Sequence, residues 1–127
     1  MLRRPFITLA ALLSFSFLAV AQAQDAVVTP RDCSGSIATG GTAQNAFSAQ
    51  GTLRGFIITN IDTSEVMWIS FTGTAAAGTA GSFPLPPATA TTFAGVASFT
   101  SPTSFRTNGA VSVVAATTGH KFSCVRW

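Results

Sequence analysis

The only histidine and the only acidic pair are the residues that could support acid–base chemistry. His120 follows a predicted turn, and Asp62 and Glu65 are separated by two residues in a polar segment. A histidine base needs a nearby nucleophile and a carboxylate that orients its ring, whereas two carboxylates alone could hydrolyse a glycoside or bind calcium. Nothing in the sequence brings the acidic pair to His120. We therefore expect a surface histidine, a solvated acidic turn and no enzymatic activity.

The two tryptophans are the candidate ligand contacts, because indole rings can form platforms for sugars. Trp68 lies inside an apolar strand, which favours packing in the core, whereas Trp127 is the last residue and can be exposed. Two cysteines and one histidine give no ligand cluster with zinc spacing. We expect no cofactor and no metal, and glycan contact at Trp127 or Trp68 remains an open alternative.

Cys33 and Cys124 are the only cysteines. In an exported chain, a single pair favours one disulfide, which here would tie the N-terminal segment to the last strand. Closing so long a loop contributes about 4–5 kcal/mol in the chain-entropy description. Two free thiols are the alternative if the leader is not an export signal.

Residues 1–23 have the pattern of a secretory signal peptide. Arg3 and Arg4 precede an apolar stretch from Phe6 to Val20, and Ala21-Gln22-Ala23 fits the small-residue cleavage rule. A retained membrane anchor is the alternative, but the apolar stretch is shorter than the ~20 residues of a spanning helix. We predict export to the periplasm or the exterior, with no membrane span in the mature form.

The mature chain would carry few charges. Removing the leader leaves 127 − 23 = 104 residues, enough for one domain. Five basic residues then face four acidic ones, so the net charge falls from +3 to +1. The absence of a basic run argues against nucleic-acid binding. So weakly repulsive a surface permits self-association, and we expect a homo-oligomer or a protein partner.

Thr52–Gly73 has the strongest strand pattern in the chain. Phe56–Ile58 and Val66–Phe71 are rich in β-branched and aromatic residues and flank a polar turn. We interpret them as a β-hairpin whose strands are covered on both faces. The Asp62-x-x-Glu65 spacing also fits a helix-capping box, but the following run is too short and too β-branched for a helix. A turn with Asp62 as an Asx cap is favoured.

Weaker signals flank this hairpin. Three prolines confine Ser82–Pro87 to a sheet edge or an extended connection, and Asn108-Gly109 favours a type I′ hairpin. About seven short strands without a helix predict an all-β fold, a small antiparallel β-sandwich behind the signal peptide. The remaining predicted segments are an arm over residues 24–40, the sandwich domain over 41–127, a strand around Thr42–Phe47, weak strands within Ala88–Ser101, hairpin strands at Thr103–Thr107 and Ala110–Ala115, a turn at Thr117–Gly119 and a last strand over His120–Trp127.

From Gly41 to Trp127, the order of several short motifs resembles that of short, largely uncharacterised proteins of tailed phages and prophages. The resemblance implies a compact β-sandwich with a virion-associated or accessory structural role, and it supplies no catalytic residues. The matching motifs are Gly41-Thr42-Ala43-Gln44, Arg54-Gly55-Phe56-Ile57-Ile58 with Asn60, Trp68-Ile69, Gly73-Thr74-Ala75-Ala76, Gly81-Ser82, Gly109-Ala110-Val111-Ser112-Val113, Ala116-Thr117-Thr118-Gly119-His120-Lys121-Phe122 and Arg126-Trp127.

These observations together predict an exported, non-enzymatic structural or interaction module of phage origin. It would act by self-association or by docking on virion or cell-surface proteins. The alternative is a secreted ligand-binding β domain, with glycans as the candidate ligands.

Overall fold

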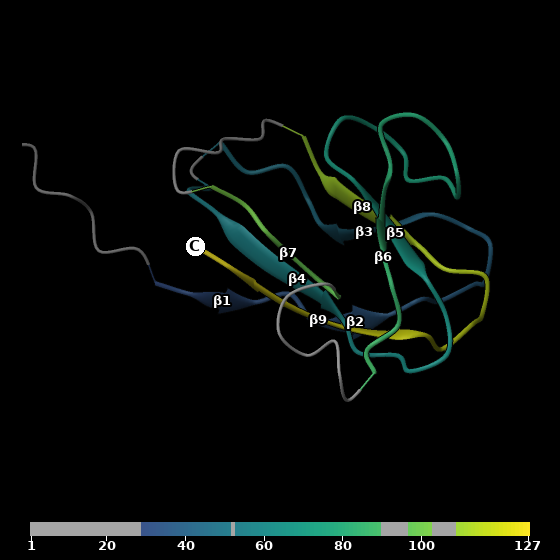
Figure 1. Ribbon diagram of the computed structural model, residues 1–127. Coiled ribbons are helices and arrows are strands. Elements are labelled where there is room, and N and C mark those ends of the chain that lie inside the picture. Colours follow the sequence, from purple (N-terminus) through teal and green to yellow (C-terminus); the bar gives the residue numbers. More distant parts are fainter. Residues whose placement is uncertain (1–28, 52, 90–96, 103–108) are drawn as a thin grey trace, which may run out of the picture.

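The computed structural model describes residues 29–51, 53–89, 97–102 and 109–127, so the predicted signal peptide lies outside the described residues. In the described ranges the chain is all-β, with two antiparallel sheets facing each other, and the β-sandwich expectation is confirmed (Figure 1). No helix of this part of the chain is long and apolar enough to cross a membrane.

Within the described ranges, nine short strands make up the two sheets. The first sheet has the order β1-β9-β4-β7, with β2 also pairing with β9, and the second has the order β3-β8-β5-β6. We call them sheet A and sheet B. The strands are β1 Arg31–Asp32, β2 Gly35–Ser36, β3 Gln44–Phe47, β4 Phe56–Asn60, β5 Met67–Ser70, β6 Phe83–Leu85, β7 Ser98–Thr100, β8 Val111–Val114 and β9 Lys121–Arg126.

The predicted hairpin between β4 and β5 is wrong. Both strands exist where the residue types indicate, but β4 lies between β9 and β7, and β5 lies between β8 and β6. The two strands therefore belong to different sheets, and the polar segment between them crosses the sandwich. It crosses because Asn60, at the end of β4, points inward and donates a hydrogen bond to the carbonyl of Glu65 at 2.8 Å.

Both faces of the central strands are covered in sheet B, but only the inner face is covered in sheet A. In β4, Phe56 and Ile58 are buried, but Ile57 faces outward and is 37% exposed, so the expectation is wrong for this strand. All four residues of β8 are buried. The difference arises because the loop after β5 folds over the outer face of sheet B, where the Ala75 N–H donates to the Ser112 hydroxyl at 3.0 Å.

Several weaker predictions are confirmed. A strand forms around Thr42–Phe47, the proline-containing strand β6 is the edge of sheet B, and β1 and β2 extend the N-terminal segment along β9. Of the predicted turn at Asn108-Gly109, only Gly109 belongs to the described residues, and the predicted strand Thr103–Thr107 lies outside them. The hairpin at this turn therefore stays a prediction. Within the predicted Ala110–Ala115, the strand β8 forms and pairs with β3 on one side and β5 on the other.

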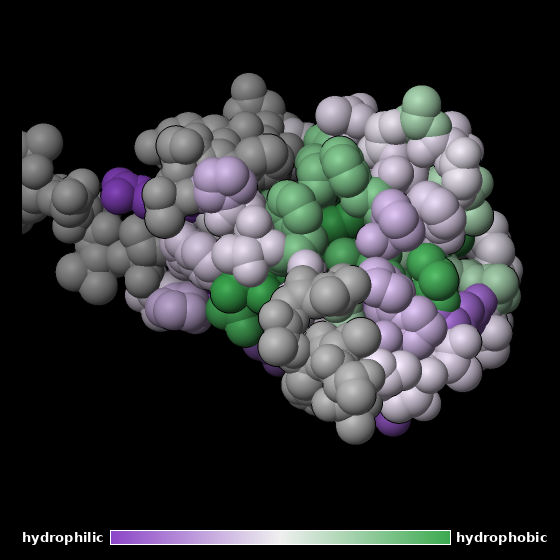
Figure 2. Space-filling model, viewed as in Figure 1, coloured by the Kyte–Doolittle hydropathy of each residue, from purple (hydrophilic) through white to green (hydrophobic). Residues whose placement is uncertain are grey.

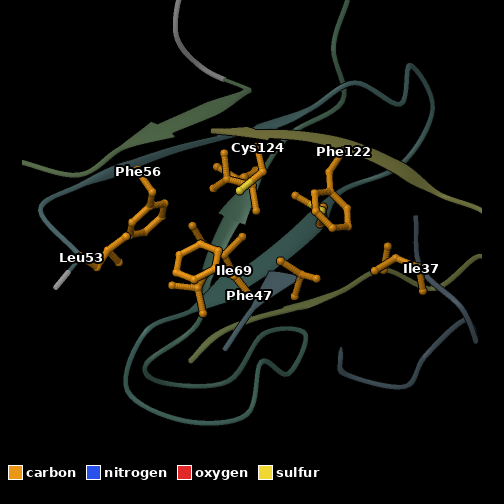
Figure 3. Packing of buried hydrophobic residues seen from close by; sticks show 13 residues of the cluster. Ile37, Phe47, Leu53, Phe56, Ile69, Phe122 and Cys124 are labelled. Carbon is orange, nitrogen blue, oxygen red and sulfur yellow. The ribbon is translucent and has the colours of Figure 1, made fainter. Parts of the chain in front are cut away.

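The core lies between the two sheets. Phe56, Phe122 and Cys124 of sheet A face Phe47 and Ile69 of sheet B (Figure 3). These side chains follow the period-two alternation of their strands, which places every second residue on the inner face. The same alternation puts two polar side chains, Asn60 and His120, inside the sandwich.

Candidate functional site

His120 is a buried residue, and the prediction of a surface histidine beside a turn is wrong. The turn at Thr117–Gly119 is present, with Gly119 at φ +85°, but the residue that follows it is only 2% exposed. His120 immediately precedes β9 and has the same strand parity as Phe122 and Cys124. It is therefore directed between the sheets.

Asn60 is the centre of a buried polar network. Its side-chain Nδ2 donates to the carbonyls of Glu65 at 2.8 Å, Leu85 at 2.9 Å and Pro86 at 3.1 Å. Its Oδ1 accepts from the Asp62 N–H at 3.0 Å and lies 3.0 Å from His120 Nε2. One amide thus links the end of β4, the crossing segment and the end of β6. We call Asn60, Asp62, Glu65 and His120 the His120 network.

The structure brings the acidic pair to His120, contrary to expectation. Glu65 Oε2 lies 3.3 Å from His120 Nδ1, and Asp62 Oδ2 lies 3.8 Å from the same nitrogen. They meet because the segment after β4 and the turn before β9 both cross between the sheets, at the same end of the sandwich. Asp62 also accepts from the Ser64 N–H at 2.8 Å and the Glu65 N–H at 3.2 Å, which confirms the Asx turn.

Glu65 fixes this end of the sandwich through its carboxylate. Its oxygens accept from the Ala116 N–H at 2.7 Å and the Thr117 N–H at 3.2 Å. Burial raises the pKa of Glu65, but hydrogen bonds from Thr117, Ala116 and His120 outweigh it, so the pKa lies below its usual value. The pKa of Asp62 is also lowered, chiefly by hydrogen bonds from Ser64 and further by the charge of His120.

Both ring nitrogens of His120 face a polar partner. Nδ2 of Asn60 faces three carbonyls, so Oδ1 is the atom of Asn60 that faces Nε2 of His120. On the other side of the ring, a carboxylate oxygen of Glu65 faces Nδ1. His120 is therefore held from both sides, between Asn60 and the acidic pair.

This arrangement is suited to cross-linking the sandwich and not to proton transfer. The side chain of His120 is fully enclosed and both nitrogens are engaged. A general base needs a free lone pair within reach of a proton on substrate or nucleophile. Among the described residues, no group of three or more histidine, cysteine or acidic side chains is arranged to hold a metal ion.

Trp68 lines a surface groove, so the expectation that it packs in the core is wrong. It faces outward from β5 opposite Val114 of β8, and it is half-buried because the loop over sheet B reaches it. The groove has a volume of about 390 Å³ and also includes Glu65, Ala116 and residues 75–77 of that loop. We call it the Trp68 groove.

Trp127 is half-buried at the other end of β9. Its N–H and C=O pair with Gly55 at 2.9 and 3.0 Å, which extends the β4–β9 ladder. A Cβ atom on Gly55 would lie only 2.7 Å from the indole, so the ring packs on this glycine. Trp127 does not line the Trp68 groove, and the two tryptophans therefore do not form one shared platform.

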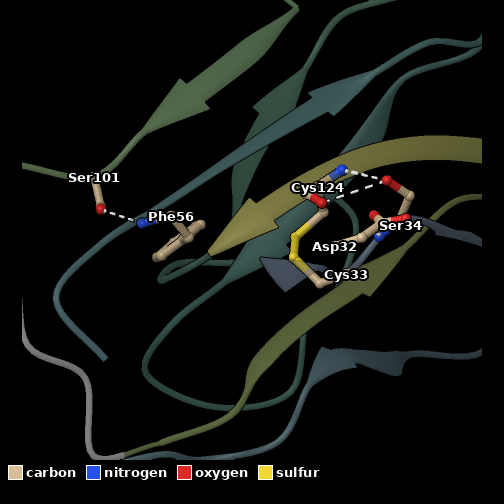
Figure 4. The surroundings of a disulfide bond; sticks show 6 residues. All are labelled: Asp32, Cys33, Ser34, Phe56, Ser101 and Cys124. Atoms are coloured by element: carbon tan, nitrogen blue, oxygen red, sulfur yellow. Dashed lines mark hydrogen bonds between the residues drawn. A yellow bond between two sulfur atoms is a disulfide. The ribbon is translucent and has the colours of Figure 1, made fainter. Parts of the chain in front are cut away.

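Cys33 and Cys124 form a disulfide, as predicted, with their Cα atoms 4.8 Å apart (Figure 4). Cys124 is buried in the core, and Cys33 lies between β1 and β2. The Ser34 hydroxyl supports the link, because it accepts from the Cys124 N–H at 2.9 Å. The disulfide joins the N-terminal strands to the central β9.

An aromatic cluster, missed from the sequence, lies where the edge strands of the two sheets meet. Phe71 lies 4.7 Å from Phe99 and 5.2 Å from Phe83, measured between ring centroids, and Phe99 contacts the core ring of Phe56. Phe83 is 48% exposed. Figure 2 shows apolar side chains gathered on the face that carries β6 and β7 in Figure 1. We call Phe71, Phe83 and Phe99 the edge cluster.

No family model, curated protein or solved structure matches this chain. Its site is therefore interpreted from its own geometry.

Proposed function

We propose that this chain is a non-enzymatic structural or interaction module that self-associates through the edge cluster. The observation that carries the proposal is the aromatic contact between β6 and β7, which ends in a half-exposed Phe83. Aromatic residues, phenylalanine among them, are enriched in the cores of protein interfaces. Contacts with the core already hold the cluster in place, so its side chains lose little conformational freedom when it binds.

The edge strands favour association through side chains over extension of a sheet. Pro84, at the centre of β6, has no backbone N–H to donate to an added strand, and β7 has only three residues. Proline and short length are the usual protections of sheet edges. A second copy would therefore pack its aromatic rings against this edge instead of adding strands to the sheet.

Other features support an exported structural role. The disulfide is weakly consistent with an oxidising compartment, and the low charge of the predicted mature form opposes association only weakly. The resemblance to phage and prophage proteins adds a virion-associated or accessory role as the proposed setting, with virion or cell-surface proteins as further partners.

Self-association can be tested with the disulfide-bonded mature protein by size-exclusion chromatography with light scattering. We expect the mass to rise with concentration, and Phe83→Ser to keep the protein monomeric. Ile61→Ser is the matched control, because Ile61 is also an exposed apolar residue but lies in the segment between the sheets. A protein that stays strictly monomeric at high concentration, and that binds neither virions nor cell-surface proteins, would contradict the proposal.

A secreted ligand-binding domain is the second candidate function. The observation that favours it is the Trp68 groove, whose volume lies within the usual range for small-molecule sites. The two tryptophans suggest a glycan as the ligand. A glycan array tests this, and binding to the wild type should be lost in Trp68→Ala or in Trp127→Ala.

A further inference from the structure

The Trp68 groove has a single charged side chain in an otherwise apolar lining. Glu65 lies with Val66, Trp68, Val114 and the alanines of residues 75–77, which offer no side-chain acceptor. A sugar presents many hydroxyls, and most would lose their water without gaining a partner here. The lining thus favours a ligand with an apolar body and one polar head.

The groove is formed before any ligand arrives. The Ala75 N–H is bound by the Ser112 hydroxyl at 3.0 Å, and the Ala76 N–H by the Ser82 hydroxyl at 3.0 Å. These bonds hold the loop at a fixed distance from the outer face of sheet B. A preformed groove avoids the entropic cost of ordering a loop on binding.

The charge at the end of the groove is negative. Glu65 and Asp62 carry two negative charges, whereas His120 can carry at most one positive charge, so the network keeps a negative charge in either state of the ring. Only Glu65 of the three lines the groove, and the N–H groups of Ala116 and Thr117 hold its carboxylate in place. A cationic head would complement this carboxylate, and an anionic head would be repelled.

We infer that the Trp68 groove binds a small organic cation, with its apolar body against Trp68 and Val114 and its ammonium head at Glu65. Indole is the aromatic ring that attracts cations most strongly, so Trp68 contributes to both parts of the ligand. This inference rests on the second candidate function, ligand binding at the groove, and does not depend on self-association through Phe83.

Three probes of the same shape test the charge preference. They are 2-phenylethylammonium, 2-phenylethanol and phenylacetate, each titrated into the disulfide-bonded protein while backbone amide chemical shifts are followed by NMR. We expect the cation to bind at least about fivefold more tightly than the alcohol, and the anion to bind most weakly. The shifts should centre on Glu65, Trp68, residues 75–77 and Val114.

Two variants identify the groups responsible. Glu65→Gln removes the charge that lines the groove, so the cation should lose most of its advantage over the alcohol and keep only the part due to Trp68. Ala76→Leu fills the groove and should abolish binding of all three probes, while both recognition groups remain. Val125→Thr, on the outer face of sheet A, is the matched control and should bind like the wild type. Thermal unfolding of each variant confirms that it is folded.

The possible failures are distinguishable. If no probe binds, the groove is not a ligand site and the second candidate function falls with the inference, whereas the result for Phe83→Ser is unaffected. If the alcohol binds as well as the cation to the wild type, a ligand groove remains but its cation selectivity is refuted. Binding of cellobiose at these residues, in the absence of binding by the cation, would replace the inference with the glycan alternative.

Discussion

At the His120 end of β9, buried polar groups satisfy one another, whereas at the Arg126 end two nitrogens of a half-buried guanidinium are enclosed without such partners. Asn60 and His120 pair with backbone and side-chain groups from three segments. Among the described residues, Nε and Nη1 of Arg126 are the buried side-chain polar atoms that make no hydrogen bond. The guanidinium lies instead over the ring of Phe47, 5.4 Å from its centroid.

The difference shows two ways of closing the ends of a small sandwich. The His120 end is closed by directional hydrogen bonds, which fix how the chain crosses between the sheets. The Arg126 end is closed by packing of Trp127 on Gly55 and by the disulfide at Cys124. Hydrogen-bonded closure should therefore be sensitive to single polar substitutions, and packed closure should tolerate them.

Loss of the disulfide should have the largest effect on the packed end. Cys33 and Cys124 are 91 residues apart, and closing a loop of this length contributes about 4–5 kcal/mol to the free energy of unfolding. Urea unfolding of a Cys33→Ala/Cys124→Ala double variant should show this loss. The wild type with reductant should match the variant, and reductant should leave the variant unchanged. A loss below about 1 kcal/mol would mean that strand pairing alone holds this end.

Asn60→Ala should have the next largest effect, at the hydrogen-bonded end. It leaves three carbonyls, the Asp62 N–H and His120 Nε2 without their partner, and unpaired buried groups cost about 1–3 kcal/mol each before relaxation. We expect a loss of about 3 kcal/mol in urea unfolding. Asn45→Ala, an exposed position on β3, is the control and should change stability little. A similarly small effect at Asn60 would contradict the proposed centre of the network.

The sequence predicts which residues are on the inner faces but not which strands pair. Period-two alternation places Phe56, Ile58 and Asn60 on one face of β4, and Phe122 and Cys124 on one face of β9, as the structure has them. The pairing of β4 with β5 was predicted from their closeness in the chain. That rule fails here because the segment between β4 and β5 crosses from one sheet to the other. The side chains of Asn60 and Asp62 provide hydrogen bonds to the backbone of this segment.

The His120 network had a partial signal in the sequence. Asn60 lies on the same face of β4 as the core residues Phe56 and Ile58, which is a signal that its amide points inward. A buried amide needs hydrogen-bond partners. The partners of Asn60 could not be found in the same way. Glu65, Leu85 and His120 meet only because the β4–β5 segment and the turn between β8 and β9 cross between the sheets at the same end of the sandwich. The Trp68 groove had no signal, since it depends on a small-residue loop covering the outer face of sheet B.

Acid should weaken the hydrogen-bonded end, which has two carboxyls with lowered pKa values, more than the packed end, where Asp32 is the one described carboxyl with a lowered pKa, held down by hydrogen bonds from Ser34. The pKa values of Asp62 and Glu65 are lowered in the folded state, from ordinary values of 3.8 and 4.5. Their contribution to stability is therefore complete above the ordinary values and is lost as the pH falls through the lower pKa values of the folded form. The free energy of unfolding should fall over that range, and Glu65→Gln should flatten the fall. An unchanged acid dependence in this variant would mean that other carboxyls dominate it.

Replacing Arg126 with methionine should have the smallest effect, and it compares the two ends most directly. Methionine keeps the long stem against Phe47 but removes the donors that lack partners, whereas the cation–ring attraction of about 0.5–2 kcal/mol is lost. Since removal of the two enclosed donors without partners offsets this loss, we expect the free energy of unfolding to change by less than about 1 kcal/mol. Arg31→Met, on the strand that pairs with Arg126, is the exposed control and should also change little. A loss above about 2 kcal/mol at Arg126 alone would show that its guanidinium stabilises this end by polar pairing, and that both ends of the sandwich are closed in the same way.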